Sequence, residues 1–191
     1  IRLGRTGMHH GMVALVCNFP GATPSNPSLL SHQEVETLFH EFGHLMHALV
    51  SCGSRYGAQN GLSTAMDFVE APSQLLEEWA WTPVVLKRIT RHHETDAGIP
   101  DELITKLLAS RQHMDANYYL AQAIMALYDF RMHSQPTGDA VEPVRLAALY
   151  RDLEREYRGM EVPDDALKAA GWSHMADYDA AYYGYLWSKV Y

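Results

Sequence analysis

The segment from Ser31 to Val50 constrains the fold of this chain more than any other part of its sequence. Ser31 and Glu34 form the pattern of a capping box, in which each side chain accepts a hydrogen bond from the backbone N–H of the other residue. Apolar residues then recur every three or four positions, which is the spacing of an amphipathic helix. The pattern predicts a helix that begins near His32 and is ended by Gly53. The apolar residues that define it are Val35, Leu38, Phe39, Phe42, Leu45, Met46 and Leu49.

Three further helical regions follow in the sequence. The first runs from about Ala71 to His93, with a kink predicted at Pro83 because proline removes a backbone hydrogen bond from a helix. The second extends over residues 101–133, is capped by Asp101 and is broken once along its length. The third covers residues 142–157.

One short segment predicts a β-strand. Residues 12–19 are apolar and rich in β-favouring residues, and they stop at Pro20-Gly21, which is typical of a turn. We find no second segment of similar strength. The sequence therefore predicts a mainly α fold with at most a small β element near the N-terminus. At about 150 residues per domain, the length predicts one domain over residues 1–191.

The composition limits the partners and the compartment. With 47% hydrophobic and 20% charged residues the chain is typical of globular proteins, and its net charge of -8 would repel nucleic acid. The longest apolar run, Met12 to Cys17, is far shorter than the roughly 20 residues of a membrane span. Cys17 and Cys52 form no Cys-x-x-Cys pair, which favours a reducing compartment, and we expect the cytoplasm. A chain that opens on Ile1 suggests a piece of a longer protein, with any targeting signal missing.

The helix near His32 also carries the sequence His40-Glu41-Phe42-Gly43-His44. Residues four apart project from one side of a helix, so the two imidazoles can reach one metal ion. At about 100° per residue, both histidines point away from the apolar face. Glu41 flanks them and can contact a water molecule on the metal without binding the metal. A chance match is the alternative, but the capped amphipathic helix around the motif favours a zinc site.

A catalytic zinc site normally has three protein ligands and keeps a fourth position for water. One class of such sites takes a third histidine from the position that Val50 occupies here, so that class is excluded. The remaining common ligand is a carboxylate of the next helix, and we choose Glu70 at the start of that helix. The alternative is that Glu70 only complements the helix dipole. The acids considered are Asp67, Glu70, Glu77 and Glu78.

Two of the other acids receive separate expectations. Glu77 lies about 10.5 Å further along the helix than Glu70, so the two carboxylates cannot share one ion. Asp67 is a candidate for orienting one zinc-bound imidazole by a hydrogen bond to its second nitrogen.

Several blocks of sequence are similar to signature blocks of the thimet oligopeptidase and oligopeptidase A family of zinc metallopeptidases, and they occur in the same order. They are residues 27–47, residues 67–74 followed by Trp79-Ala-Trp81, and residues 182–187. The resemblance implies that residues 1–191 are the central part of a multi-helical, zincin-like catalytic domain and a fragment of a longer chain. Members of the family have two lobes that enclose a channel for short peptides.

The resemblance also implies roles for individual residues around the zinc. Position by position, His40, His44 and Glu70 correspond to the ligands of one Zn²⁺ ion. Glu41 corresponds to the general base, which takes a proton from the zinc-activated water and passes it to the leaving amine.

A cluster of aromatic residues near the C-terminus gains a role in the same way. The family's residues that match Tyr178, Tyr182, Tyr185 and His174 border the zinc and donate hydrogen bonds to the substrate or to the developing oxyanion. Composition alone would describe these tyrosines as packing residues.

The sequence thus predicts a zinc metalloendopeptidase that hydrolyses internal bonds of short oligopeptides. A peptidyl-dipeptidase of the same family and a non-catalytic module whose helices are joined by zinc are the alternatives. We expect short peptides as substrates, a monomer, and neither nucleic acid nor membrane as a partner. The isolated fragment is expected to bind zinc with weak or no turnover.

Overall fold

The computed structural model describes residues 12–25, 27–51, 56, 59, 61–113, 115–134 and 143–191. In these residues the regular structure is helical and contains no strand, which confirms the mainly α fold; an isolated bridge joins Arg91 and Gly98. The chain divides into two compact units, Ile1–His113 and Met114–Tyr191, and each is described by itself. The expectation of one domain over the whole chain stays a prediction.

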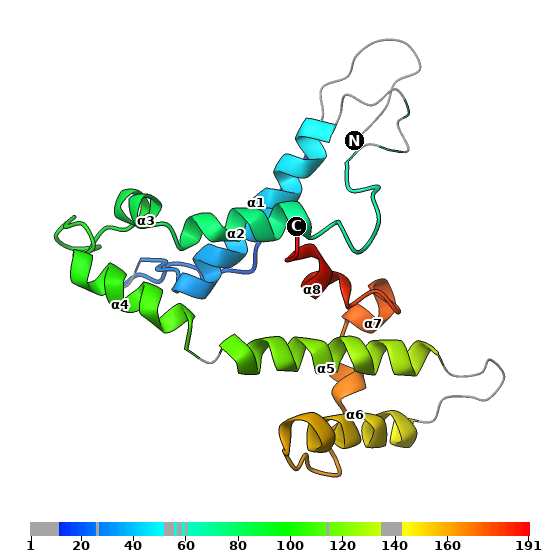
Figure 1. Cartoon of the computed structure of the whole chain (residues 1–191). Helices are drawn as coiled ribbons and strands as arrows, with labels where there is room; N and C mark the ends of the chain where they lie inside the picture. Colours follow the sequence, from blue (N-terminus) through cyan, green and yellow to red (C-terminus); the bar gives the residue numbers. More distant parts are fainter. Residues whose placement is uncertain are drawn as a thin grey trace. The chain divides into compact units, whose positions relative to one another are not determined.

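The first unit contains α1 (His32–Val50), α2 (Ala71–Ala80), α3 (Pro83–Ile89) and α4 (Asp101–Arg111) (Figure 1). The capping box at the start of α1 is confirmed. The N–H of Ser31 donates to Glu34 Oε2 at 2.7 Å, and the N–H of Glu34 donates to Ser31 Oγ at 3.3 Å. Gly53 and Cys52 lie outside the described residues, and α1 ends before them.

The most extensive contact between helices of the first unit is that of α1 with α2, which cross in Figure 1. Gly43 is buried at this crossing. A Cβ atom at Gly43 would lie 2.7 Å from the carbonyl oxygen of Pro72 and closer still to the Cα atom of Ser73. The absence of a side chain at Gly43 therefore lets the two backbones approach each other.

A second group of contacts joins three helices of this unit. Trp81, just after α2, donates from Nε1 to Glu36 Oε1 of α1 at 2.8 Å. The Arg111 guanidinium at the end of α4 lies 4.9 Å from the centre of the Trp81 ring and also donates to the carboxylate of Glu78. These contacts hold the far end of α2 against α1 and α4.

The predicted helix over residues 71–93 is two helices in the structure. Pro83 does not kink one helix but begins α3, after a break at Trp81 and Thr82. Proline favours the first turn of a helix, where its missing N–H has no partner to lose. The break in the region 101–133 is confirmed, between α4 and α5 (Asp115–His133). The prediction that Asp101 caps this region is wrong, because the N-cap of α4 is Pro100, and Asp101 is the first residue of the helix and pairs with Lys87.

The prediction of a strand over residues 12–19 is wrong. Residues 12–20 have no regular secondary structure, and the side chains of Met12 and Val16 are 86% and 79% exposed. A strand is stabilised by hydrogen bonds to a neighbouring strand, and no segment in the described part of the chain pairs with this one.

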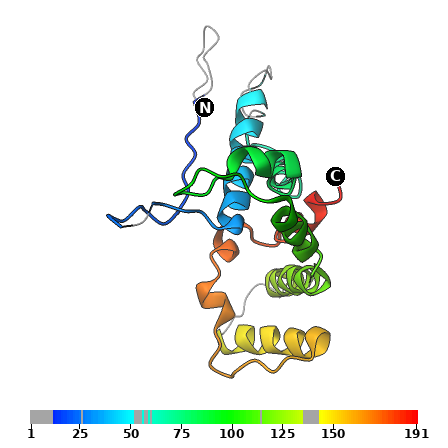
Figure 2. The same cartoon turned by 90° about the vertical axis from the view of Figure 1, so that its left-hand side faces the viewer.

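The second unit contains α5, α6 (Pro143–Arg158), η3 (Lys168–Gly171), α7 (His174–Asp177) and α8 (Gly184–Ser188). Helices α5 and α6 pack against each other and lie side by side in both views (Figures 1 and 2). The helix predicted over 142–157 is confirmed as α6, although Glu142 lies outside the described residues. The buried core of the unit comprises Ile124, Met125, Tyr128, Leu153, Trp172 and Tyr182. No helix in the described part of the chain is both long enough and apolar enough to cross a bilayer.

We expect Gly43→Ala to destabilise the first unit, because the added methyl group meets backbone atoms of α2 that cannot rotate away. Such overpacking costs about 1–3 kcal/mol, against a gain of about 1 kcal/mol from the higher helix propensity of alanine. Thermal unfolding should therefore occur at a lower temperature than in the unchanged protein. Gly171→Ala is the control, since a Cβ atom there meets nothing within 4 Å. Equal unfolding temperatures for the two variants would contradict this prediction.

Candidate metal centre

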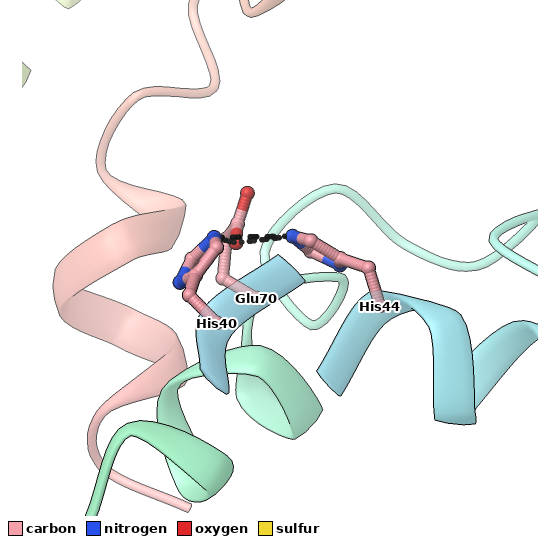
Figure 3. A group of neighbouring side chains, drawn as sticks. All are labelled: His40, His44 and Glu70. Carbon is pink, nitrogen blue, oxygen red and sulfur yellow. Dashed lines mark hydrogen bonds and ion pairs between the residues drawn. The ribbon is translucent and has the colours of Figure 1, made fainter. Parts of the chain in front are cut away.

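Three side chains of the first unit converge where α1 faces the start of α2. Figure 3 shows the imidazoles of His40 and His44 reaching the carboxylate of Glu70. Glu70 Oε2 lies 3.3 Å from His40 Nε2 and 3.1 Å from His44 Nε2. The two Nε2 atoms lie 3.2 Å apart. The three donor atoms thus form a nearly equilateral triangle.

The helices explain why these donors meet. His40 and His44 stand on successive turns of α1, and Glu70 is the N-cap residue of α2. Between the histidines, Gly43 lets the backbone of α2 come close to α1. Ser73 then fixes the acid, because its Oγ donates to Glu70 Oε2 at 2.9 Å. The Glu70 side chain is almost fully buried.

The triangle fits a tetrahedral metal site. Donors at about 2.0–2.1 Å from a tetrahedral zinc ion lie roughly 3.3–3.4 Å from one another. The three distances between Glu70, His40 and His44 range from 3.1 to 3.3 Å, so little movement is needed to hold one ion. Two histidines and one glutamate are also a common ligand set of catalytic zinc, with the fourth position left to water.

The surroundings of His40 favour positive charge at this place. Burial lowers the pKa of His40, but hydrogen bonds to Glu70 and Glu77 and the charges of these carboxylates outweigh it and raise the pKa to about 9. A buried carboxylate such as Glu70 is costly without a compensating charge. The site is therefore suited to a cation shared among the three donors.

Glu77 makes a contact with His40 that was not predicted from the sequence. Its Oε1 lies 2.6 Å from His40 Nδ1, so it holds the ring by the nitrogen that faces away from Glu70. The expectation that Asp67 orients one of these imidazoles stays a prediction. Glu77 lies two helical turns after Glu70 on the same face of α2. This spacing could have predicted that Glu77 also faces α1. The expectation that Glu77 and Glu70 do not share an ion agrees with this arrangement.

Glu41 follows His40 directly and is half-buried. It does not belong to the group of possible ligands formed by His40, His44 and Glu70. Within the described residues, no hydrogen bond or ion pair engages its carboxylate. The group is thus available to a water molecule, as a general base requires.

The predicted aromatic residues lie together in the second unit. The ring of His174 is 5.8 Å from that of Tyr178, 5.3 Å from that of Tyr182 and 5.7 Å from that of Tyr185. Tyr182 is 9% exposed, and its hydroxyl donates to Gln122 Oε1 at 3.1 Å. Burial raises the pKa of Tyr182, and the bond to Gln122 lowers it only in part, so the hydroxyl keeps its proton. That these residues border the metal stays a prediction.

The donor set and its placement on a helix carrying His-Glu-x-x-His are features of zinc-dependent hydrolases. Comparison of sequences identifies the family. The chain belongs to Peptidase family M3, a family of metallopeptidases, and matches it over residues 4–191. The resemblance to the thimet oligopeptidase and oligopeptidase A group is thereby confirmed.

Individual relatives agree with this assignment. The chain is 35% identical over 183 residues to Thimet-like oligopeptidase of Dictyostelium discoideum, covering 94% of the chain and 27% of the relative. It is 34% identical over 178 residues to Oligopeptidase A of Escherichia coli (strain K12), covering 92% and 26%. It is 34% identical over 184 residues to Dipeptidyl carboxypeptidase of the same organism, covering 95% and 27%. The chain thus spans about a quarter of the length of these relatives.

We expect Glu77→Gln to weaken zinc binding about 10- to 100-fold, because a carboxylate on the outer nitrogen of a ligating histidine orients the ring and makes it more basic. Competition with a chromophoric chelator measures the affinity. Glu78→Gln is the control, since Glu78 is the next residue of α2 and pairs with Arg111 instead. The same zinc affinity in both variants would show that the contact with His40 has no such effect.

Proposed function

We propose that this chain forms the zinc-binding, catalytic part of a metalloendopeptidase that hydrolyses internal peptide bonds of short oligopeptides. The observation that carries the proposal is the triangle of His40 Nε2, His44 Nε2 and Glu70 Oε2, with edges of 3.1–3.3 Å. Membership of Peptidase family M3 supports the same conclusion. We also propose that the protein acts as a monomer in the cytoplasm, without nucleic acid or membrane as a partner.

In this proposal His40, His44 and Glu70 hold one Zn²⁺ ion. When bound, zinc supplies a Lewis acid that polarises the substrate carbonyl and lowers the pKa of a water molecule to about 7. The carboxylate of Glu41 takes the proton from the attacking water and then donates it to the nitrogen of the leaving amine. Its freedom from other partners in the described part of the chain suits this movement of a proton.

The aromatic cluster of the second unit supplies hydrogen-bond donors. We assign the hydroxyls of Tyr182 and Tyr185 to the developing negative charge on the carbonyl oxygen, and His174 and Tyr178 to the substrate. Tyr182 has to exchange its bond with Gln122 for one with the substrate. The loss of one such donor typically slows a reaction about 10²- to 10³-fold.

We expect Glu41→Gln in the full-length protein to keep zinc and to lose peptide cleavage by about 10²- to 10⁴-fold in kcat, the usual contribution of a general base. Metal analysis and cleavage of a fluorogenic peptide measure the two properties separately. Glu36→Gln is a control on the same helix, because glutamine still accepts the hydrogen bond from Trp81. Retained zinc with undiminished cleavage in Glu41→Gln would reject the mechanism. A zinc-containing wild-type protein without cleavage would instead favour the non-catalytic, zinc-joined module.

A peptidyl-dipeptidase is the second candidate, because one relative of similar identity is named Dipeptidyl carboxypeptidase. The two activities differ in their products. An endopeptidase should cut a peptide of about ten residues at internal bonds and should still cut it when the C-terminus is amidated. Release of successive dipeptides from the C-terminus, with loss of cleavage after amidation, would favour the second candidate. Mass spectrometry of the products at early times distinguishes them.

A further inference from the structure

Asp129 is a buried acid of the second unit that the proposed reaction does not use. It lies on α5 and is only 1% exposed. Its Oδ1 accepts a hydrogen bond from the backbone N–H of Ala180 at 3.1 Å, and its Oδ2 accepts one from the backbone N–H of Tyr182 at 3.0 Å. His133, one turn later on α5, places Nδ1 at 2.8 Å from Oδ1. Both oxygens of the carboxylate are therefore engaged, and both bind the segment that carries the tyrosines.

These bonds hold a backbone conformation that the segment would not adopt readily. Ala180 has a φ of 57°, in the left-handed region that residues with a Cβ atom seldom occupy. Hydrogen bonds from N–H groups to a buried carboxylate are among the stronger ones in proteins. The carboxylate of Asp129 thus offsets the strain at Ala180 and fixes the course of the chain into Tyr182.

The anchored segment positions the tyrosine side chains. The Tyr182 ring packs against Trp172 at 4.8 Å between ring centres and against Tyr185 at 5.0 Å. Gln122, also on α5, accepts a hydrogen bond from the hydroxyl of Tyr182. One helix therefore holds Tyr182 at both its backbone and its hydroxyl.

We propose that Asp129 is a positioning residue for peptide hydrolysis. It acts through the backbone of Ala180 and Tyr182 and sets the place of the hydroxyls of Tyr182 and Tyr185. This inference rests on the proposed function of these tyrosines. It does not depend on the metal ligands, which belong to the other unit.

Glu154 provides a matched control for the stability of the same unit. It is 3% exposed. Its Oε1 accepts a hydrogen bond from the Tyr150 hydroxyl at 2.8 Å, and its Oε2 forms an ion pair with Arg158 at 3.1 Å. Like Asp129, it is a buried acid with a basic partner one turn later on its helix. Its replacement tests the effect of losing a buried acid that does not bond to the tyrosine segment.

The first experiment measures the anchoring itself by hydrogen exchange of the zinc-loaded protein. In Asp129→Asn, the side-chain NH₂ group faces one of the two backbone N–H groups, and two donors cannot bond to each other. The backbone N–H groups of Ala180 and Tyr182 should therefore exchange about 10-fold faster or more. Glu154→Gln should leave these two amides unchanged. Unchanged exchange in Asp129→Asn would overturn the proposal. If that variant does not fold, His133→Ala, at a partly exposed position, should accelerate the same amides to a smaller degree, and unchanged exchange there would also overturn it.

The second experiment measures catalysis in the full-length protein. Asp129→Asn should lower kcat about 10- to 100-fold, the effect of a misplaced group, with little change in KM and unchanged zinc content. Combined with Tyr185→Phe, its effect on kcat should be less than multiplicative, because both changes remove the same donor. An equal fall of kcat in Glu154→Gln, or fully multiplicative effects, would overturn the positioning role. If Tyr185→Phe and Tyr182→Phe keep full activity while exchange still rises in Asp129→Asn, the role proposed for the tyrosines has failed and the anchoring by Asp129 has not.

Discussion

The close contact of α1 and α2 at Gly43 is the constraint on which the candidate metal centre depends. Two of its donors come from α1 and the third from the N-cap of α2, so their separation is set by the distance between the two backbones. The carbonyl oxygen of Pro72 occupies the space where a side chain of residue 43 would begin. Glycine lowers the stability of a helix interior by about 1 kcal/mol relative to alanine. Here that cost allows three donor atoms to come within 3.1–3.3 Å of one another.

Once the helices are in contact, the two acids Glu70 and Glu77 lie on different sides of the His40 ring. Glu70 is buried, accepts a hydrogen bond from the hydroxyl of Ser73 and faces the imidazoles of His40 and His44. Glu77, two turns later, contacts the outer nitrogen of His40. The His40 ring lies between two carboxylates. A hydrogen bond at one ring nitrogen orients the imidazole, and the other nitrogen can bind a cation. The spacing of the two acids along the chain thus separates the candidate ligand Glu70 from Glu77, which contacts the outer nitrogen of His40.

The features that the sequence could predict are those encoded over one or two helical turns. The capping box at Ser31, the pairing of His40 with His44 and the acid at the start of the next helix follow from spacing. The break before Pro83 is a local feature that was predicted as a kink, whereas two other wrong or missing predictions concern partners distant in sequence. Residues 12–19 have the composition of a strand but no described neighbour to pair with, and the contact of Glu77 with His40 spans 37 positions. Gly43 carried a signal that was not used, because a glycine inside a strongly patterned helix indicates a close neighbour.

In the proposed mechanism, metal binding and peptide hydrolysis depend on different contacts in this chain. The three donors, Ser73 and Glu77 all belong to the first unit, on or next to α1 and α2. The tyrosine segment belongs to the second unit and is held there by α5, through Asp129 and Gln122. In that mechanism, a substitution on α5 removes hydrogen-bond donors from the reaction without a change in the proposed ligand set. Zinc content and turnover then report on separate parts of the chain, and a loss of activity with full zinc content indicates a fault in the hydrogen-bond donors or the base rather than in the ligands.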